Sequence, residues 1–388
     1  MNLFFLFLAI AVTLPGIFMS WSHIGFGPLL DSITFGAGIF SAAFILSWAA
    51  EIAQMDISKG LALAILALIA ILPEYAVDLY FAWVAAYDPI YISYASANMT
   101  GANRLLVGGG WSLIVFLFYF KFKNRGISLT SNNRAEISYL TIATLYAFTI
   151  PLKGSLNVID FIILACIFAG YAWRTAIMEV HEPELVGPAR LIARLPQQKR
   201  RIVNLSLFLF SGFAIYCCAE PFAEALIDSG KILGVDEYFL VQWLAPLASE
   251  SPEFIIASLW TLRGQPTAAL TALISSAVNQ WTLLIGTLPV VYSISGGSIK
   301  SMLLDARQQQ EILLTAALSL FAVTLLVKLH ISWRETLLLF TIFISQLIYP
   351  DIRLEASVLC LLLALIFALR GRQHLKPLFL EGLLNRKP

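Results

Sequence analysis

Charged residues are scarce in this chain. Of its 388 residues, 13% are charged and 59% are hydrophobic, and the mean hydropathy is +0.81. Soluble globular domains carry about 25% charged residues, so this composition excludes an ordinary soluble fold. The formal net charge of +1 gives no basis for a polyanionic partner, so we expect no nucleic-acid binding.

Cysteine and histidine are almost as scarce, with four of each. The cysteines lie in apolar runs without metal-ligand spacing, and we interpret them as packing residues: Cys166, Cys217, Cys218 and Cys360. The histidines lie far apart, in loops or at the ends of apolar runs. The His-Glu-x-x-His, Gly-x-Ser-x-Gly and P-loop motifs are missing, so the sequence argues against an enzyme and against any cofactor beyond a transported cation.

Long apolar runs are what the chain has in abundance. Runs of about 20 residues recur from end to end, and each can cross roughly 30 Å of hydrocarbon as a helix. They lack the alternation of a membrane β-barrel. We therefore predict an all-α polytopic membrane protein with twelve spans: 2–20, 28–50, 57–86, 90–120, 135–152, 155–174, 202–226, 238–262, 266–292, 310–329, 332–349 and 353–370.

The basic residues test this count. With twelve spans, 19 Lys and Arg residues fall on the side of the N-terminus and 5 on the other side, while Arg104 falls within a span. The positive-inside rule then places both termini in the cytoplasm. No organelle address is evident in the sequence, and we expect a prokaryotic inner membrane.

Two stretches of the chain repeat one pattern. Residues 47–74 and 223–253 both run from a helix through a short polar turn into an apolar helix that ends in Pro-Glu. Five crossings separate the two Pro-Glu helices, so they cross in opposite directions. Inverted repeats with broken helices are a transporter architecture, with the ion site near the midplane. The alternative is that Pro-Glu recurs by chance.

The repeat sets the predicted organisation of the chain. We expect two inverted-topology repeats of about five helices, with one extra helix at each end. The predicted parts are an extra N-terminal helix (1–26), a first repeat (27–174), a cytoplasmic linker (175–201), a second repeat (202–350), and an extra helix with a cytoplasmic tail (351–388). Because residues 1–26 lack a basic n-region, we expect a retained helix and not a cleaved signal.

The two Pro-Glu glutamates, Glu74 and Glu253, are the leading candidate cation ligands. A charged residue at mid-helix costs about 2.5–3.5 kcal/mol on insertion scales, so an acid there must pair, bind a cation or take up a proton. Proline frees a backbone carbonyl one turn earlier. Carbonyls and carboxylates together suit hard cations such as Ca²⁺ or Na⁺. The alternative is two structural glutamates held by neighbouring polar groups.

Two further acids accompany this pair. Asp78 lies four residues after Glu74, on the same helical face, and Glu250 lies three residues before Glu253. Both acids either enlarge the site or reach the mouth of a cavity.

Neutral oxygens come from the helices that follow each Pro-Glu segment. The candidates are Asn98, Asn103, Ser276, Asn279 and Gln280. They can serve as cation ligands or, equally, as hydrogen-bonding groups between helices.

Arg104 is the unusual residue of the first such helix. A lone arginine within a span needs a carboxylate partner, and we expect Asp78 or Glu74. Arg104 either acts as a tethered cation that competes with the transported ion or forms a structural ion pair away from the pathway.

These residues resemble the cation/Ca²⁺ exchanger superfamily, which contains Na⁺/Ca²⁺ and H⁺/Ca²⁺ antiporters. Its two repeats carry a Gly-Thr-Ser-x-Pro-Glu motif and a later Gly-Asn-x-x-Gly-Ser-Asn motif. The corresponding stretches here are IAILPE (69–74) with ANMTGAN (97–103), and ASESPE (248–253) with ISSAVNQ (274–280). The resemblance covers about residues 36–110 and 212–290. It implies that Glu74 and Glu253 are the central cation ligands.

The chain also departs from the family pattern. The motif hydroxyls map to Ser249 in the second repeat, where Glu250 replaces the other one, and Ala70 and Ile71 replace both in the first. Ser276 and Gln280 fall at the family's ligand positions, whereas Asn98 and Asn103 fall there only in a shifted alignment. Fewer hydroxyls and more ionisable groups favour proton coupling.

The sequence therefore predicts a secondary-active antiporter that exchanges Ca²⁺ or a related cation for H⁺ or Na⁺. Its partners would be inorganic cations and the lipid bilayer. The alternative is a transporter-fold scaffold or sensor without exchange activity, in which Arg104 occupies the cation site.

Overall fold

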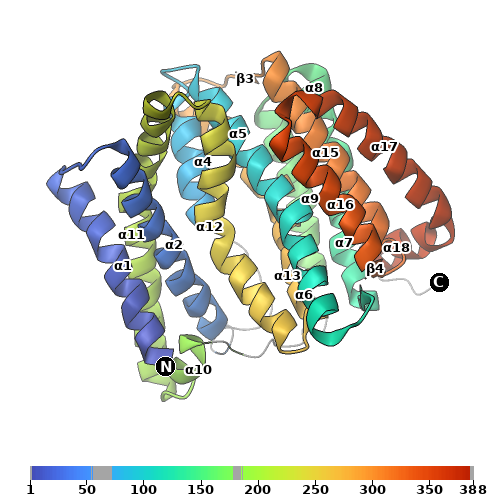
Figure 1. Ribbon diagram of the computed structural model, residues 1–388, viewed down its shortest axis with the longest axis horizontal. Helices are drawn as coiled ribbons and strands as arrows, with labels where there is room; N and C mark the ends of the chain where they lie inside the picture. The colour runs from blue at the N-terminus through green and yellow to red at the C-terminus, as the bar shows by residue number, and fades with distance from the viewer. Residues whose placement is uncertain (1, 54, 56–71, 178–184, 186, 385–388) are drawn as a thin grey trace. The chain divides into compact units, whose positions relative to one another are not determined.

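The computed structural model describes residues 2–53, 55, 72–177, 185 and 187–384 (Figure 1). These residues are almost entirely helical. Nine helical segments among them are long and apolar enough to cross a membrane: 3–22, 28–53, 91–122, 131–153, 158–176, 197–233, 266–295, 306–326 and 350–370. The predicted all-α polytopic membrane fold is confirmed.

The three other predicted spans have simple outcomes. The spans at 238–262 and 332–349 correspond to helices α12 (Glu237–Leu262) and α16 (Trp333–Ile348). The span at 57–86 lies largely outside the described residues, and its described part forms α4 (Leu72–Val84).

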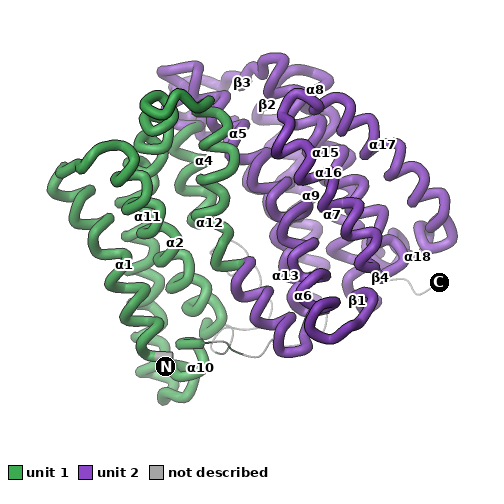
Figure 2. The backbone as a smooth tube through the Cα atoms, in the orientation of Figure 1, with its two compact units in different colours: residues 1–81, 179–253 green, residues 82–178, 254–388 purple. Residues whose placement is uncertain are grey.

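The chain forms two compact units, and each takes helices from both halves of the sequence (Figure 2). Unit 1 comprises residues 1–81 and 179–253. Its helices are α1 (Asn2–Ser22), α2 (Pro28–Ala53), α10 (Pro188–Ile192), α11 (Gln197–Leu233) and most of α4 and α12. In unit 1, Ile45, Trp48 and Ile52 of α2 form one apolar core with Leu207 of α11.

Unit 2 comprises residues 82–178 and 254–388. Its elements from the first half are α5 (Tyr91–Arg104), η1 (Leu105–Gly110), α6 (Trp111–Phe122), β1 (Gly126–Ser128), η2 (Ser131–Asn133), α7 (Arg134–Ala147), α8 (Thr149–Lys153), β2 (Ser155–Leu156) and α9 (Val158–Ala176). Those from the second half are α13 (Pro266–Asn279), η3 (Gln280–Leu284), α14 (Ile285–Ser295), β3 (Met302–Leu303), α15 (Ala306–Leu326), β4 (His330–Ser332), α16, η4 (Pro350–Ile352), α17 (Arg353–Arg370) and α18 (Arg372–Leu384).

Two small antiparallel sheets join the halves within unit 2. Strand β1 pairs with β4, and β2 pairs with β3. The strand before the fourth helix of one repeat therefore pairs with the strand before the fifth helix of the other repeat. Loops at successive positions of one repeat lie on opposite sides of a membrane, so these pairings require the two repeats to have opposite orientations. The sheets thus provide a structural argument for inversion that is independent of charge.

Local structure repeats along unit 2 at a spacing of 175 residues. Asn157 begins α9 and Ser332 begins α16, and each forms a reciprocal capping box, with Asp160 and Glu335 respectively. Such boxes satisfy backbone donors that the first helical turn leaves without partners. Four residues before each cap lies a lysine, Lys153 or Lys328, that forms an ion pair with the acid of the same box. The repeat is therefore a repeat of structure as well as of sequence.

The C-terminal tail forms a helix that the sequence did not indicate. Residues 372–384 fold as α18, which packs on α7. The Ser138 hydroxyl donates a hydrogen bond to the Leu378 carbonyl at 3.0 Å, and Arg134 forms an ion pair with Glu381. The tail is thus an ordered part of unit 2.

The prediction for the cysteines is correct for three of the four. Cys217, Cys218 and Cys360 are buried, but Cys166 is exposed. Cys166 lies on an outward face of α9, and an apolar run within a membrane can present such a residue to lipid without burying it. The prediction is therefore wrong for Cys166.

Gly108 permits a close approach between η1 and α16. A Cβ atom added at Gly108 would lie 2.6–2.7 Å from three atoms of Phe343, whereas one added at Gly109 would have its nearest contact at 3.4 Å. Overpacking a filled interior typically costs 1–3 kcal/mol. We expect Gly108→Ala to lower the free energy of unfolding by about that amount.

The matched control is Gly109→Ala, which adds the same methyl group one residue along the chain. The measurement is the unfolding midpoint of each purified variant in detergent. Equal midpoints for Gly108→Ala and Gly109→Ala would contradict the packing explanation.

Candidate cation site

Glu74 and Asp78 lie on one helix of unit 1. Glu74 is in the first turn of α4, directly after Pro73, and its side chain is buried. Asp78 is fully buried one turn later. Residues four apart occupy the same helical face, so both carboxyl groups lie on one side of α4. The prediction of a shared face is therefore consistent with the helix that the structure contains.

The second Pro-Glu segment lies inside α12. Pro246 and Pro252 are both within this helix, Glu250 is fully buried and Glu253 is partly buried. The Ser249 hydroxyl is shared between the carbonyls of Ala245 and Pro246, both at the long distance of 3.3 Å.

Pro252 has no N–H group, so the Ala248 carbonyl loses its helical donor. A carbonyl oxygen and a hydroxyl oxygen are thus available close to the two acids of α12.

The predicted neutral ligands lie in unit 2. Asn98, Asn103 and Gln280 are almost fully buried, and Ser276 is partly buried. The Asn103 amide donates a hydrogen bond to the Met99 carbonyl at 3.0 Å, which leaves its oxygen to face other groups. Asn279 is buried beside Gln280. Their role as ligands stays a prediction.

Both helices that carry these amides change to π-helix at equivalent positions. The segment η1 begins at Leu105, directly after Arg104, and η3 begins at Gln280, directly after Asn279. The two starting points are 175 residues apart, the spacing of the capping boxes. Single π-helical turns occur mostly at functional sites, because they displace side chains from the regular helical positions. The structure therefore marks the same depth in both repeats.

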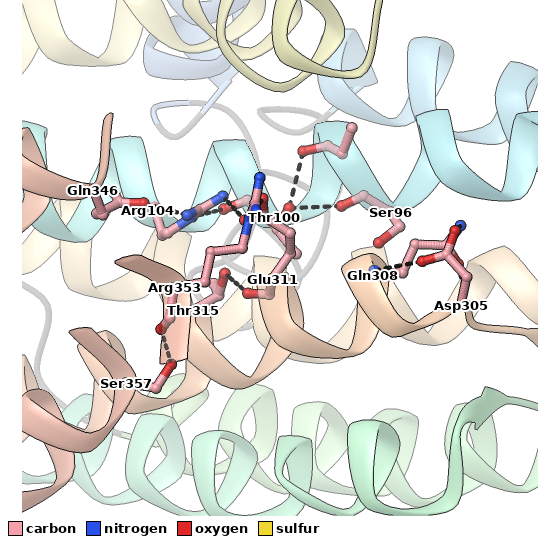
Figure 3. Close-up of polar contacts among 11 residues, drawn as sticks. Ser96, Thr100, Arg104, Asp305, Gln308, Glu311, Thr315, Gln346, Arg353 and Ser357 are labelled. Atoms are coloured by element: carbon pink, nitrogen blue, oxygen red, sulfur yellow. Dashed lines mark hydrogen bonds and ion pairs between the residues drawn. The ribbon is translucent and has the colours of Figure 1, made fainter. Parts of the chain in front are cut away.

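Arg104 is held by an ion-pair cluster within unit 2 (Figure 3). Its Nη2 atom lies 2.5 Å from Oε2 of Glu311, and its Nη1 donates to Oε1 of Gln346. Its Nε donates to the Thr100 carbonyl at 3.3 Å. The second oxygen of Glu311 accepts from Nε of Arg353 at 2.6 Å.

Arg104 and Glu311 are each 2% exposed. The expected carboxylate partner therefore exists, but the ion pair that the structure shows is with Glu311, which the sequence did not single out. Pairing of Arg104 with Asp78 or Glu74 stays a prediction.

The sequence missed the other members of this cluster as well. Glu311 lies at the edge of the predicted span 310–329, Gln346 near the end of a span and Arg353 at the start of another, so each seemed interfacial. A search at fixed spacing would have found Glu311, because it lies 175 residues after Glu136, and both residues precede an isoleucine.

Among the described residues, no group of three or more His, Cys, Asp or Glu side chains could hold a metal ion. The sequence predicted two carboxylates with neutral oxygens, which is a different kind of site.

A family model described as "Sodium/calcium exchanger protein" matches residues 30–176 and 203–350. One model thus matches both predicted repeats. A search of curated proteins finds no match.

Among solved structures, the H⁺/Ca²⁺ exchanger CAX is 44% identical, with a TM-score of 0.94 over 97% of this chain and 96% of that chain. YfkE is 14% identical, with a TM-score of 0.63 over 89% and 98% of the two chains. The sodium-calcium exchanger NCX_Mj is 14% identical, with a TM-score of 0.54 over 89% and 99%. The last two matches support the fold alone.

The predicted resemblance is confirmed, and with it the interpretation of a transporter and not an enzyme. The family match covers most of the chain in two stretches, and the helical fold, the repeat and the buried polar residues agree with it. The chain belongs to the sodium/calcium exchanger family of membrane transporters.

Proposed function

We propose that this protein is a secondary-active antiporter that exchanges Ca²⁺, or a related cation, for H⁺. The observation that carries the proposal is the 44% identity to a solved H⁺/Ca²⁺ exchanger over 97% of the chain. The Na⁺-coupled relative is only 14% identical, which gives less support to Na⁺ as the coupling ion.

The acids of unit 1 supply a physical reason for proton coupling. Glu74, Asp78 and Glu250 are buried, and a buried acid must be paired, bound to a cation or protonated. Two carboxylates can bind one divalent cation or two protons, and both states carry the same total charge. Such a pair can therefore alternate between the two kinds of ion within one site.

We propose Glu74 and Glu253 as the cation ligands in an alternating-access cycle with a midplane site. Ser249 and the amide-bearing residues Asn98, Asn103, Ser276 and Gln280 are proposed as neutral oxygen donors. Asp78 and Glu250 are proposed to carry protons or to enlarge the site.

We further propose that both termini lie in the cytoplasm of a prokaryotic cell. The sheet pairings support this sidedness, because β1 and β4 bring together two loops that each carry basic residues. These residues are Lys121, Lys123, Arg125, Arg134, Lys328 and Arg334. A cluster of basic residues on one side is typical of a cytoplasmic face.

The direct test is flux into proteoliposomes that contain the purified protein. We expect an imposed pH gradient to drive uptake of radioactive Ca²⁺, and an outward Na⁺ gradient at constant pH to drive none. The control is the same vesicle with the gradient collapsed by an ionophore. Uptake driven by the Na⁺ gradient alone would overturn proton coupling. Uptake under neither gradient would overturn Ca²⁺ exchange.

A further inference from the structure

Glu311 has a counterpart in the first repeat, and that counterpart has no role in the site described above. Glu136 lies 175 residues before Glu311, in the fourth helix of its own repeat. The helix caps confirm this alignment, because the boxes Thr130–Asn133 and Asp305–Gln308 precede the two glutamates at the same spacing. Tyr171 corresponds in the same way to Gln346. The two glutamates are therefore equivalent positions of the inverted repeat.

The surroundings of the two carboxyl groups differ. Glu311 accepts from Arg104 and from Arg353, so both of its oxygens face guanidinium groups. Glu136 forms no ion pair with any described residue, and its Oε2 has no hydrogen-bond partner among them, although the residue is only 8% exposed. The residue equivalent to Arg104 is Asn279, which is uncharged. One carboxylate is thus held ionised, and its counterpart lacks that arginine.

The titratable and charged groups around Glu136 are few. Arg134 and Tyr139 are on its own helix, and Arg134 is paired with Glu381 of α18. Tyr171 and Arg174 of α9 are close enough to interact with it electrostatically.

The other elements that pack on α7 contribute no such group at this end of the helix. α13, η2 and η3 contain no titratable residue. In the antiparallel α15, Arg307 and Glu311 lie at the far end, and Lys153 of α8 lies at the far end of α7 itself.

Helix α18 lies over the end of α7 where Glu136 is found. Ser138 and Arg134, two residues to either side of it, both contact α18. Arg174 donates to the carbonyls of Gly382 and Glu381, at 3.1 and 3.2 Å. This end of α7 follows β1, on the side for which we propose a cytoplasmic location. Glu136 is therefore buried close to one membrane face beneath an ordered helix.

A buried carboxylate pairs, binds a cation or takes up a proton. The first is absent for Glu136 among the described residues, and a divalent cation needs about six or more oxygen ligands, which a single acid among apolar and amide groups does not supply. We propose that Glu136 is a proton-binding site, which takes up and releases a proton during exchange, while Glu311 remains ionised. This inference rests on the proposed H⁺ coupling and assigns one of its proton sites.

The test has one arm that needs no transport. Infrared difference spectra of the purified full-length protein are recorded without Ca²⁺ between about pH 9 and about pH 5, a range that reaches buried carboxyl groups. We expect a protonated-carboxyl C=O band that Glu136→Gln lacks. The control Glu355→Gln, at the exposed start of α17, should retain it. Glu136→Asp should restore a shifted band, which excludes misfolding as the cause of the loss.

The second arm measures Ca²⁺ uptake at a series of imposed pH gradients. Glu136→Gln should show a several-fold smaller stimulation by the gradient than the wild type and Glu355→Gln. A band that persists in Glu136→Gln, or an unchanged response to the gradient, overturns the proposal. Absence of Ca²⁺ uptake in the wild type would overturn the proposed function instead, and the infrared arm would then decide the proton site alone.

Discussion

Glu74→Gln and Glu253→Gln should each reduce Ca²⁺ uptake to the background of empty vesicles. Glutamine has nearly the same shape as glutamate but carries no charge and presents one oxygen instead of two. Residues that only orient a metal ligand typically cost 10–100-fold in affinity when they are mutated, so loss of a proposed ligand itself should cost at least about that much.

The measurement is uptake of radioactive Ca²⁺ under a pH gradient, together with Ca²⁺ binding to the purified protein in detergent. Glu355→Gln is the control, because it removes one carboxylate at an exposed position of α17. If both site variants transport Ca²⁺ like the wild type, the two glutamates are not the ligands. If only one variant transports, the site is not shared between the repeats.

Arg104→Gln and Glu311→Gln should each destabilise the protein by about 3–5 kcal/mol. Both side chains are 2% exposed, and removal of one partner from a buried ion pair leaves the other charge without compensation. Arg353→Gln is the matched control. It also removes a guanidinium from Glu311 but leaves Arg104 in place, so it should cost less.

The double variant Arg104→Gln/Glu311→Gln should recover part of the loss, because it removes both charges. The measurement is the unfolding free energy of each purified variant in detergent, combined as a double-mutant cycle. The competing hypothesis is that Arg104 occupies the cation site. Arg104→Ala with wild-type stability and stronger Ca²⁺ binding would favour that hypothesis and sink the structural one.

The membrane fold could be predicted because its signal is spread over long segments. Each apolar run contributes about 20 residues, and the distribution of basic residues tests the count as a whole. The sheets could not be predicted in this way, because β2 and β3 are two residues long and too short to show any periodicity. Helix α18 was missed because its sequence, RQHLKPLFLEGLL, combines basic residues with an internal proline and looks like a tail.

The candidate site shows a similar division. Arg104 indicated a buried ion pair, since an arginine within a span needs a carboxylate. The sequence could not name Glu311, because the two residues are 207 positions apart and meet only through the packing of α5 against α15. The Pro-Glu segments stand out in the sequence for the opposite reason, because proline and glutamate are adjacent and repeat in order.

The 207 residues between Arg104 and Glu311 also set an order of events during synthesis. At about 5–20 residues per second, Glu311 is made roughly 10–40 s after Arg104. Strands β1 and β2 wait in the same way for β4 and β3. The first half of the chain therefore enters the membrane with an arginine that costs about 2.5–3.5 kcal/mol to insert and whose carboxylate does not yet exist. Completion of unit 2 depends on translation of the second half, so a ribosome that stalls between these residues should leave a fragment fit for membrane quality control.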